Sequence, residues 1–109
     1  GAPADRTADW TRPARGRNVR TWATVPPAWI GGDLELRLGT VTRADETYAG
    51  GVRIGGMNPL SPSLCRVYRV PGWLVGAHVE LTVRVLADKP GDGIRWAGGG
   101  TPLLLPISE

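Results

Sequence analysis

The sequence contains one cysteine, one histidine, one lysine and no phenylalanine among its 109 residues. The single cysteine, Cys65, excludes an internal disulfide framework. No apolar run approaches the about 18 residues that a transmembrane helix needs, and no signal-peptide pattern is present, so we expect no membrane span. Nucleophilic catalysis that depends on histidine would have to use His78, and no serine lies near it in the sequence. We therefore expect His78 to face solvent at the start of a strand, and we expect no enzyme activity from this chain alone.

Excess positive charge is confined to the N-terminal part of the chain. Residues 1–20 hold five arginines and two aspartates, whereas residues 21–109 hold eight basic and eight acidic residues. Nucleic-acid binding requires basic residues clustered on one face of a fold, so we expect no nucleic-acid partner. Residues 1–17 are interpreted as an irregular, Arg- and Pro-rich lead-in or linker, with a first strand as the alternative. Residues 18–109 are interpreted as a single domain.

The remainder of the chain is a series of short segments in which apolar residues recur at every second position. Leu34, Leu36 and Leu38 alternate with charged residues, and the segment 79–85 is apolar at every odd position. The pair at residues 50–51, Gly-Gly, lies between two such segments and predicts a hairpin turn. With 16 glycines and 10 prolines, the chain leaves little room for a helix longer than one turn. The pattern predicts an all-β, antiparallel β-sandwich.

Five short motifs follow one another between about residues 19 and 105. Their residues are Arg20, Trp22 and Pro26; Leu36, Leu38 and Gly39; Asp45, Thr47, Tyr48 and Gly51; Arg66, Tyr68, Val70 and Pro71; and Val83, Val85, Asp88, Gly91, Gly93 and Ile94. In this order and spacing they resemble the β-sandwich domain of sialate O-acetylesterase-like proteins and the sugar-binding domain of glycoside hydrolase family 2. Two positions depart from those domains: Gly50 stands where they have asparagine, and Trp22 where they have phenylalanine.

The resemblance implies a jelly-roll fold of the galactose-binding-like type. It also implies a non-catalytic carbohydrate-binding or accessory module that binds sugar weakly and is linked to a catalytic domain of esterase or glycosidase type. An action on glycans would place such a module in a secreted or periplasmic setting. The alternative is a purely structural domain that packs against a catalytic neighbour and has no ligand of its own.

Four residues are candidates for a sugar site, because sugars are bound by an aromatic surface together with a few fixed polar groups. Trp96 follows a Gly/Asp-rich loop, while Arg66 and Tyr68 alternate onto one face of a predicted strand. Asp45 belongs to the predicted hairpin, and a structural ion pair between Asp45 and Arg66 is the alternative interpretation. Two further tryptophans, Trp22 and Trp73, are expected to fill the core.

The carboxylates do not suggest a catalytic pair. Asp45 and Glu46 are adjacent, so on a strand their side chains point to opposite faces and cannot flank one glycosidic bond. Calcium is common in the fold group that the chain resembles, and it prefers carboxylate and carbonyl oxygens. Asp88 and Asp92, in the loop before residue 93, are the candidate ligands for a structural calcium ion, and the alternative of no metal stays open.

Overall fold

The fold was described from a computed structural model, which describes residues 9–10, 18–41, 44–57, 64–86 and 93–107. The strands in these residues are β1 (Asp9–Trp10), β2 (Asn18–Thr24), β3 (Leu34–Val41), β4 (Ala44–Ala49), β5 (Val52–Met57), β6 (Leu64–Val70), β7 (His78–Leu86), β8 (Ile94–Trp96) and β9 (Leu103–Pro106). Two single-turn 3-10 helices, η2 (Pro27–Trp29) and η3 (Gly72–Leu74), complete the described elements. Within the described residues, no helix is both long enough and apolar enough to cross a membrane.

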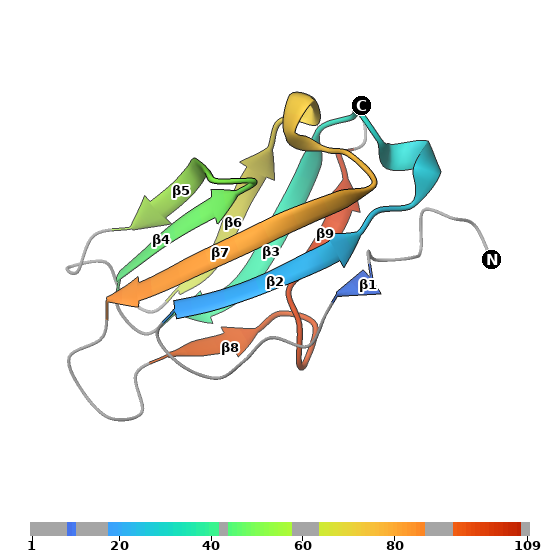
Figure 1. The fold of residues 1–109 in the computed structure, drawn as a ribbon. Coiled ribbons are helices and arrows are strands. Elements are labelled where there is room, and N and C mark those ends of the chain that lie inside the picture. Colours follow the sequence, from blue (N-terminus) through green and yellow to red (C-terminus); the bar gives the residue numbers. More distant parts are fainter. Residues whose placement is uncertain (1–8, 11–17, 42–43, 58–63, 87–92, 108–109) are drawn as a thin grey trace.

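The strands form two sheets that pack face to face, as Figure 1 shows. The first sheet has five strands in the order β1-β2-β7-β4-β5. In the second sheet β3 is central, with β6 on one side and with β8 and β9 pairing along it as well. Each of these strand pairs is antiparallel. The predicted all-β, antiparallel sandwich is therefore confirmed.

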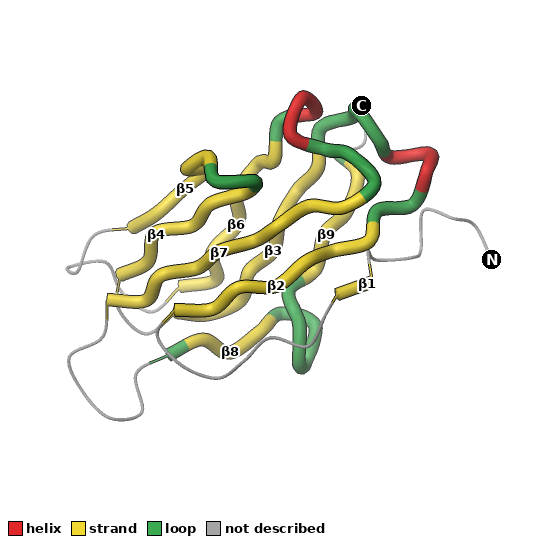
Figure 2. Tube along the Cα trace, in the orientation of Figure 1, coloured by secondary structure: helices red, strands yellow, loops and turns green. Residues whose placement is uncertain are grey.

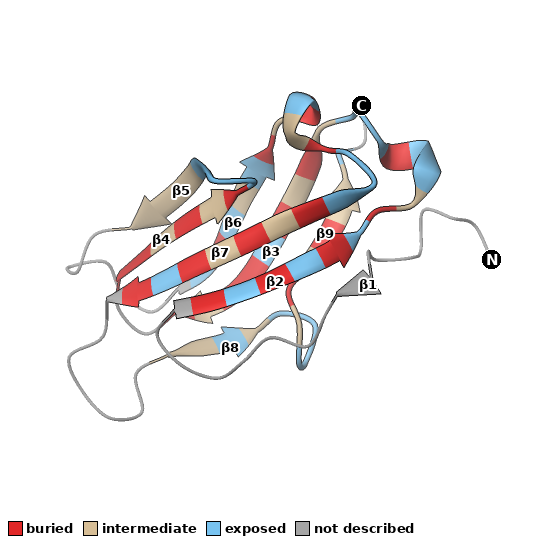
Figure 3. Cartoon of the chain, viewed as in Figure 1, coloured by how far each residue is buried: buried red, intermediate tan, exposed pale blue. Residues whose placement is uncertain are grey.

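The core lies between the two sheets and includes the apolar residues that the period-two pattern predicted. Leu34, Leu36 and Leu38 of β3 face the odd-numbered apolar residues of β7, and all of them are buried. Figure 3 shows buried residues alternating with exposed and half-buried residues along β2 and β7. Burying such a side chain contributes about 1.5–3 kcal/mol, so this alternation is what holds the sheets together.

The hairpin between β4 and β5 turns at Gly50 and Gly51, as predicted. Their φ angles of 55° and 81° lie in the left-handed region, which glycine adopts without a steric penalty. Positive φ at both central residues is typical of the tight turns whose twist matches that of the flanking strands. Next to this turn Ala49 pairs with Val52 and Tyr48 with Arg53, and the register then shifts by one residue so that Thr47 pairs with Gly55.

Both short helices lie at the same end of the sandwich (Figure 2). The backbone N–H of Gly31 donates to the carbonyl of Val75 at 2.9 Å, which ties the segment after η2 to the segment after η3. Trp29 of η2 is buried, whereas Trp73 of η3 is 75% exposed. The expectation that Trp73 fills the core is wrong, because η3 turns its side chain outward and Trp29 occupies the interior at this end instead.

The expectation that Trp22 fills the core is also wrong, since 41% of this residue is exposed. On β2 the buried residues are Val19, Thr21 and Ala23, so the pleat directs Trp22 to the outer face of the sheet. At the edge of this sheet β1 pairs with β2, with Trp10 opposite Ala23. β1 thus lies inside the segment for which a linker and a first strand were both considered.

Candidate functional site

Three of the four residues predicted for a sugar site meet in the interior, between β4 and β6. Arg66 Nε donates to Asp45 Oδ1 at 3.0 Å, and both side chains have 0% exposed surface. The Tyr68 hydroxyl lies 2.9 and 2.7 Å from the two Asp45 oxygens and donates its one proton to this carboxylate. Thr47 Oγ1 donates to Asp45 Oδ2 at 2.8 Å. The alternative interpretation, a structural ion pair between Asp45 and Arg66, is confirmed.

This interior cluster is built by residues far apart in the sequence. Asp45 and Thr47 alternate onto the inner face of β4, while Arg66 and Tyr68 alternate onto the inner face of β6 in the opposite sheet. Charged hydrogen bonds of this kind are stronger than neutral ones, and a buried carboxylate needs them. The cluster therefore joins the two sheets by polar contacts within their buried interface.

The ring of Tyr68 lies against the backbone of β5. A Cβ atom added to Gly55 would come within 2.3–2.6 Å of three ring carbons, so only glycine leaves room for the ring there. Burial raises the pKa of the Tyr68 hydroxyl, and its hydrogen bond to the Asp45 carboxylate raises this pKa further. Tyr68 therefore stays protonated and keeps donating at neutral pH.

The fourth predicted residue, Trp96, lies on β8. It pairs with Gly39, and Gly39 pairs with Arg66 on the other side of β3, so the three residues form one row across the sheet. Trp96 packs against the core and is half-buried. Ligand contacts by Trp96 and by the interior cluster stay a prediction, and Asp45 and Arg66 expose no surface on which a ligand could rest. The candidate calcium ligands, Asp88 and Asp92, lie outside the described residues.

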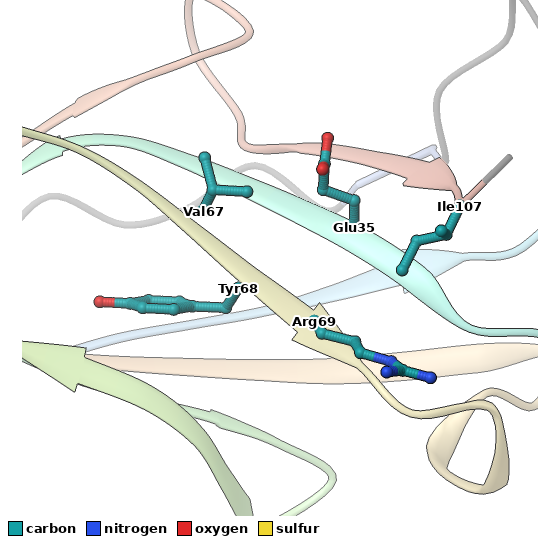
Figure 4. A pocket seen from close by; sticks show the side chains of 5 residues that line it. All are labelled: Glu35, Val67, Tyr68, Arg69 and Ile107. Atoms are coloured by element: carbon teal, nitrogen blue, oxygen red, sulfur yellow. The ribbon is translucent and has the colours of Figure 1, made fainter.

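A shallow depression of about 250 Å³ lies on the outer face of the second sheet (Figure 4). Its lining includes Glu35 from β3, Val67 and Arg69 from β6, and Ile107. The fifth lining residue is Tyr68, whose ring points away from the other four side chains. The depression thus offers no aromatic surface to a sugar. Two lining residues form ion pairs: Glu35 with Arg37 at 2.7 Å, and Arg69 with Asp33.

The outer face of the five-stranded sheet brings a tryptophan and a tyrosine together with charged and polar side chains. Trp22 on β2 stands opposite Glu80 on β7, and Arg20 stands opposite Thr82, which in turn stands opposite Tyr48 on β4. Residues opposite each other on paired strands point to the same side, so these five side chains share one surface. We call Arg20, Trp22, Tyr48, Glu80 and Thr82 the aromatic strip.

Several polar side chains of the aromatic strip contact a neighbouring side chain on the same face. Arg20 Nε lies 3.8 Å from a carboxylate oxygen of Glu80, and the Arg20 guanidinium carbon lies 5.9 Å from the centre of the Trp22 ring. That distance is near the outer limit of a cation–π contact, and the Arg20 side chain is largely exposed, so it remains available as a donor beside the ring. The Tyr48 hydroxyl donates to Glu46 at 3.4 Å, a long hydrogen bond along the same face.

The sequence did contain a signal for this surface. The alternation of residues 18–25 places Arg20, Trp22 and Thr24 together, opposite the apolar set, and a tryptophan in such a polar set faces outward. The local pattern could not predict that Tyr48 belongs to the same surface. Tyr48 lies on β4, which pairs with β7 on the side opposite β2.

The sole histidine of the chain, His78, is exposed at the start of β7, as predicted. Among the described residues, no group of three or more His, Cys, Asp and Glu side chains is placed to hold a metal ion.

Neither family models nor curated proteins give a significant match to this chain.

Proposed function

We propose that this chain is a non-catalytic carbohydrate-binding module that binds sugar on the aromatic strip. The observation that carries the proposal is the exposure of Trp22 on the outer face of the sheet, with Arg20 and Glu80 beside it. The proposal includes a jelly-roll fold of the galactose-binding-like type, with which the packing of a five-stranded sheet on a smaller antiparallel sheet is consistent.

The chemistry of the aromatic strip suits a pyranose ring. The C–H face of a sugar packs on an indole, and its hydroxyl groups exchange water for fixed donors and acceptors at the rim. Glu80 accepts such hydrogen bonds, Arg20 donates them, and the Thr82 hydroxyl does both. A single site of this size binds in the range of about mM to µM, or about −4 to −8 kcal/mol.

Weak binding of this kind is useful when the module is attached to a catalytic domain. Tethering raises the effective concentration of the enzyme near its polymeric substrate without strengthening any single contact. We therefore propose that the module serves a carbohydrate-active enzyme of esterase or glycosidase type.

Isothermal titration calorimetry with a panel of neutral mono- and oligosaccharides tests the proposal. Binding of at least one sugar class should be lost or lowered about threefold to tenfold in Trp22→Ala, which removes the stacking surface. Trp73→Ala is the matched control, because it removes an exposed tryptophan from the end of the sandwich and should leave binding unchanged. The proposal fails if no sugar in the panel binds at millimolar concentration.

A second candidate function is a purely structural domain that packs against a catalytic neighbour. The observation that favours it is the exposure of Trp73 and Ile30 at the end of the sandwich where η2 and η3 meet. Exposed apolar residues gathered in one region mark surfaces that another protein covers. In that case no sugar would bind, and fluorescence of 8-anilinonaphthalene-1-sulfonate on the folded chain would fall in Trp73→Ser but not in Trp22→Ser.

A further inference from the structure

We propose that the aromatic strip binds an uncharged oligosaccharide of three or more units, which lies diagonally across β2, β7 and β4 from Trp22 to Tyr48. This inference rests on the proposed function and adds the length, the direction and the charge of the ligand. It is carried by the register of the three strands, which places two aromatic side chains on one face with polar side chains between them.

The distance between the two aromatic residues follows from the strand pairing. Trp22 pairs with Glu80, while Tyr48 pairs with Thr82, two residues further along β7. Two strand spacings of about 4.8 Å and two residues of about 3.4 Å each place the Cα atoms of Trp22 and Tyr48 about 12 Å apart. Neighbouring rings of a disaccharide are much closer than this. A ligand that stacks on both side chains must therefore have at least one further sugar unit between them.

The surface between the two aromatic residues is polar and belongs to β7. Glu80 and Thr82 are both half-buried, with their side chains on the outer face of the central strand of the three. A sugar unit above them meets a carboxylate and a hydroxyl rather than a ring. The order of aromatic, polar and aromatic side chains across β2, β7 and β4 thus suits a chain whose end units stack and whose middle unit forms hydrogen bonds.

Charges on this face are paired, which favours an uncharged ligand. Glu80 lies within 3.8 Å of Arg20, and Glu46 lies 3.9 Å from Arg53 and 3.7 Å from Arg84. Among the described residues of this face, each carboxylate lies beside at least one arginine, so these residues form no cluster of one sign that would attract an acidic sugar. An anionic sugar would also meet the carboxylate of Glu80 at the middle of the strip.

The experiment is calorimetric titration with length series of one to six units, using β-1,4-linked glucose, xylose, mannose and galactose oligosaccharides as ligands. In the series that binds, the affinity should rise about threefold to tenfold between the disaccharide and the tetrasaccharide, since the longer ligand reaches the second ring. Trp22→Ala should lower the affinity for all lengths. Tyr48→Ala should lower it only for three units or more, and Tyr48→Phe, which keeps the ring, should retain most of the length dependence.

The outcomes separate this inference from the proposed function. Affinity that does not change with length, or a Tyr48→Ala variant with unchanged affinity for the tetrasaccharide, overturns the inference and leaves the module a binder of single sugar units. Tighter binding of an oligogalacturonate than of the neutral galactose series overturns the assignment of an uncharged ligand. Absence of binding in every series overturns the proposed function itself. Thermal melting of each variant establishes that it is folded, which is expected because both aromatic residues lie on the outer face.

Discussion

Replacing Arg66 with methionine removes the guanidinium group from the interior and leaves the Asp45 carboxylate buried beside the hydroxyls of Thr47 and Tyr68. Loss of one partner from a buried ion pair costs about 3–5 kcal/mol, because the other charge is left without compensation. The free energy of unfolding of a domain of this size is about 5–15 kcal/mol. We therefore expect Arg66→Met to lose roughly a fifth or more of the free energy of unfolding of the chain.

A double-mutant cycle isolates the contribution of the pair. Asp45→Leu alone leaves the arginine buried without its carboxylate, whereas Asp45→Leu with Arg66→Met buries no charge. The double variant should therefore be less destabilised than the sum of the two single variants, with a coupling of about 2–3 kcal/mol. The double variant still carries a cost, since the hydroxyls of Thr47 and Tyr68 have lost their common acceptor.

Urea unfolding at pH 7, followed by far-ultraviolet circular dichroism, gives the free energies for the cycle. Arg84→Met is the matched control, because Arg84 lies on the outer face 3.7 Å from Glu46 and is largely exposed. Its loss should cost less than about 1 kcal/mol. A cost below about 1 kcal/mol for Arg66→Met as well, or single effects that simply add, would refute the reasoning that this buried pair joins the two sheets.

Three further predictions concern the surroundings of the interior cluster and the end of the sandwich. Gly55→Ala should cost about 1–3 kcal/mol in urea unfolding, because its methyl group would overlap the Tyr68 ring, and the same substitution made in a Tyr68→Ala background should cost less, since the ring is then absent. The raised pKa of Tyr68 predicts that stability falls as pH rises above 10.0, where the unfolded tyrosine ionises and the folded one does not; Tyr68→Phe should weaken this fall in alkaline unfolding curves, and identical slopes would contradict it. The hydrogen bond from Arg69 and that from the Gly72 N–H hold the pKa of Asp33 below 3.8, so stability should fall as pH drops below this value, and acid unfolding of Asp33→Asn should show a smaller fall than the unsubstituted chain.

Much of the fold could be predicted from the sequence, because a strand has a pattern of alternating apolar residues that is visible within a few positions. The alternation in residues 34–38 and 79–85 correctly predicted both the strands and their inner faces, and Gly50-Gly51 correctly predicted the hairpin turn. The wrong expectations concerned tryptophans. Size and hydrophobicity suggested that Trp22 and Trp73 fill the core, whereas the pleat of β2 and the turn of η3 direct them outward.

The candidate site was predictable only in part. The Asp45–Arg66 pair was an expected alternative, because a charged residue at an inner position of a strand needs a partner of opposite charge. The aromatic strip was not expected. Its members come from β2, β4 and β7, and a pairing register between distant strands leaves no trace in the spacing of residues within any one of them.

For β2, β3 and β7 the sequence by itself determined that the segment is a strand and which of its sides is apolar, since both follow from a period of two over a few residues. The tertiary structure decided which strands lie next to one another and which residues contact each apolar or polar side. β7 lies between β2 and β4, which sets Trp22 and Tyr48 on one surface, and β4 faces β6 across the core, which brings Arg66 to Asp45. The physical reason is that the order and register of the strands must bury the apolar sides of both sheets together. This requirement involves the whole chain and cannot be read from any single segment.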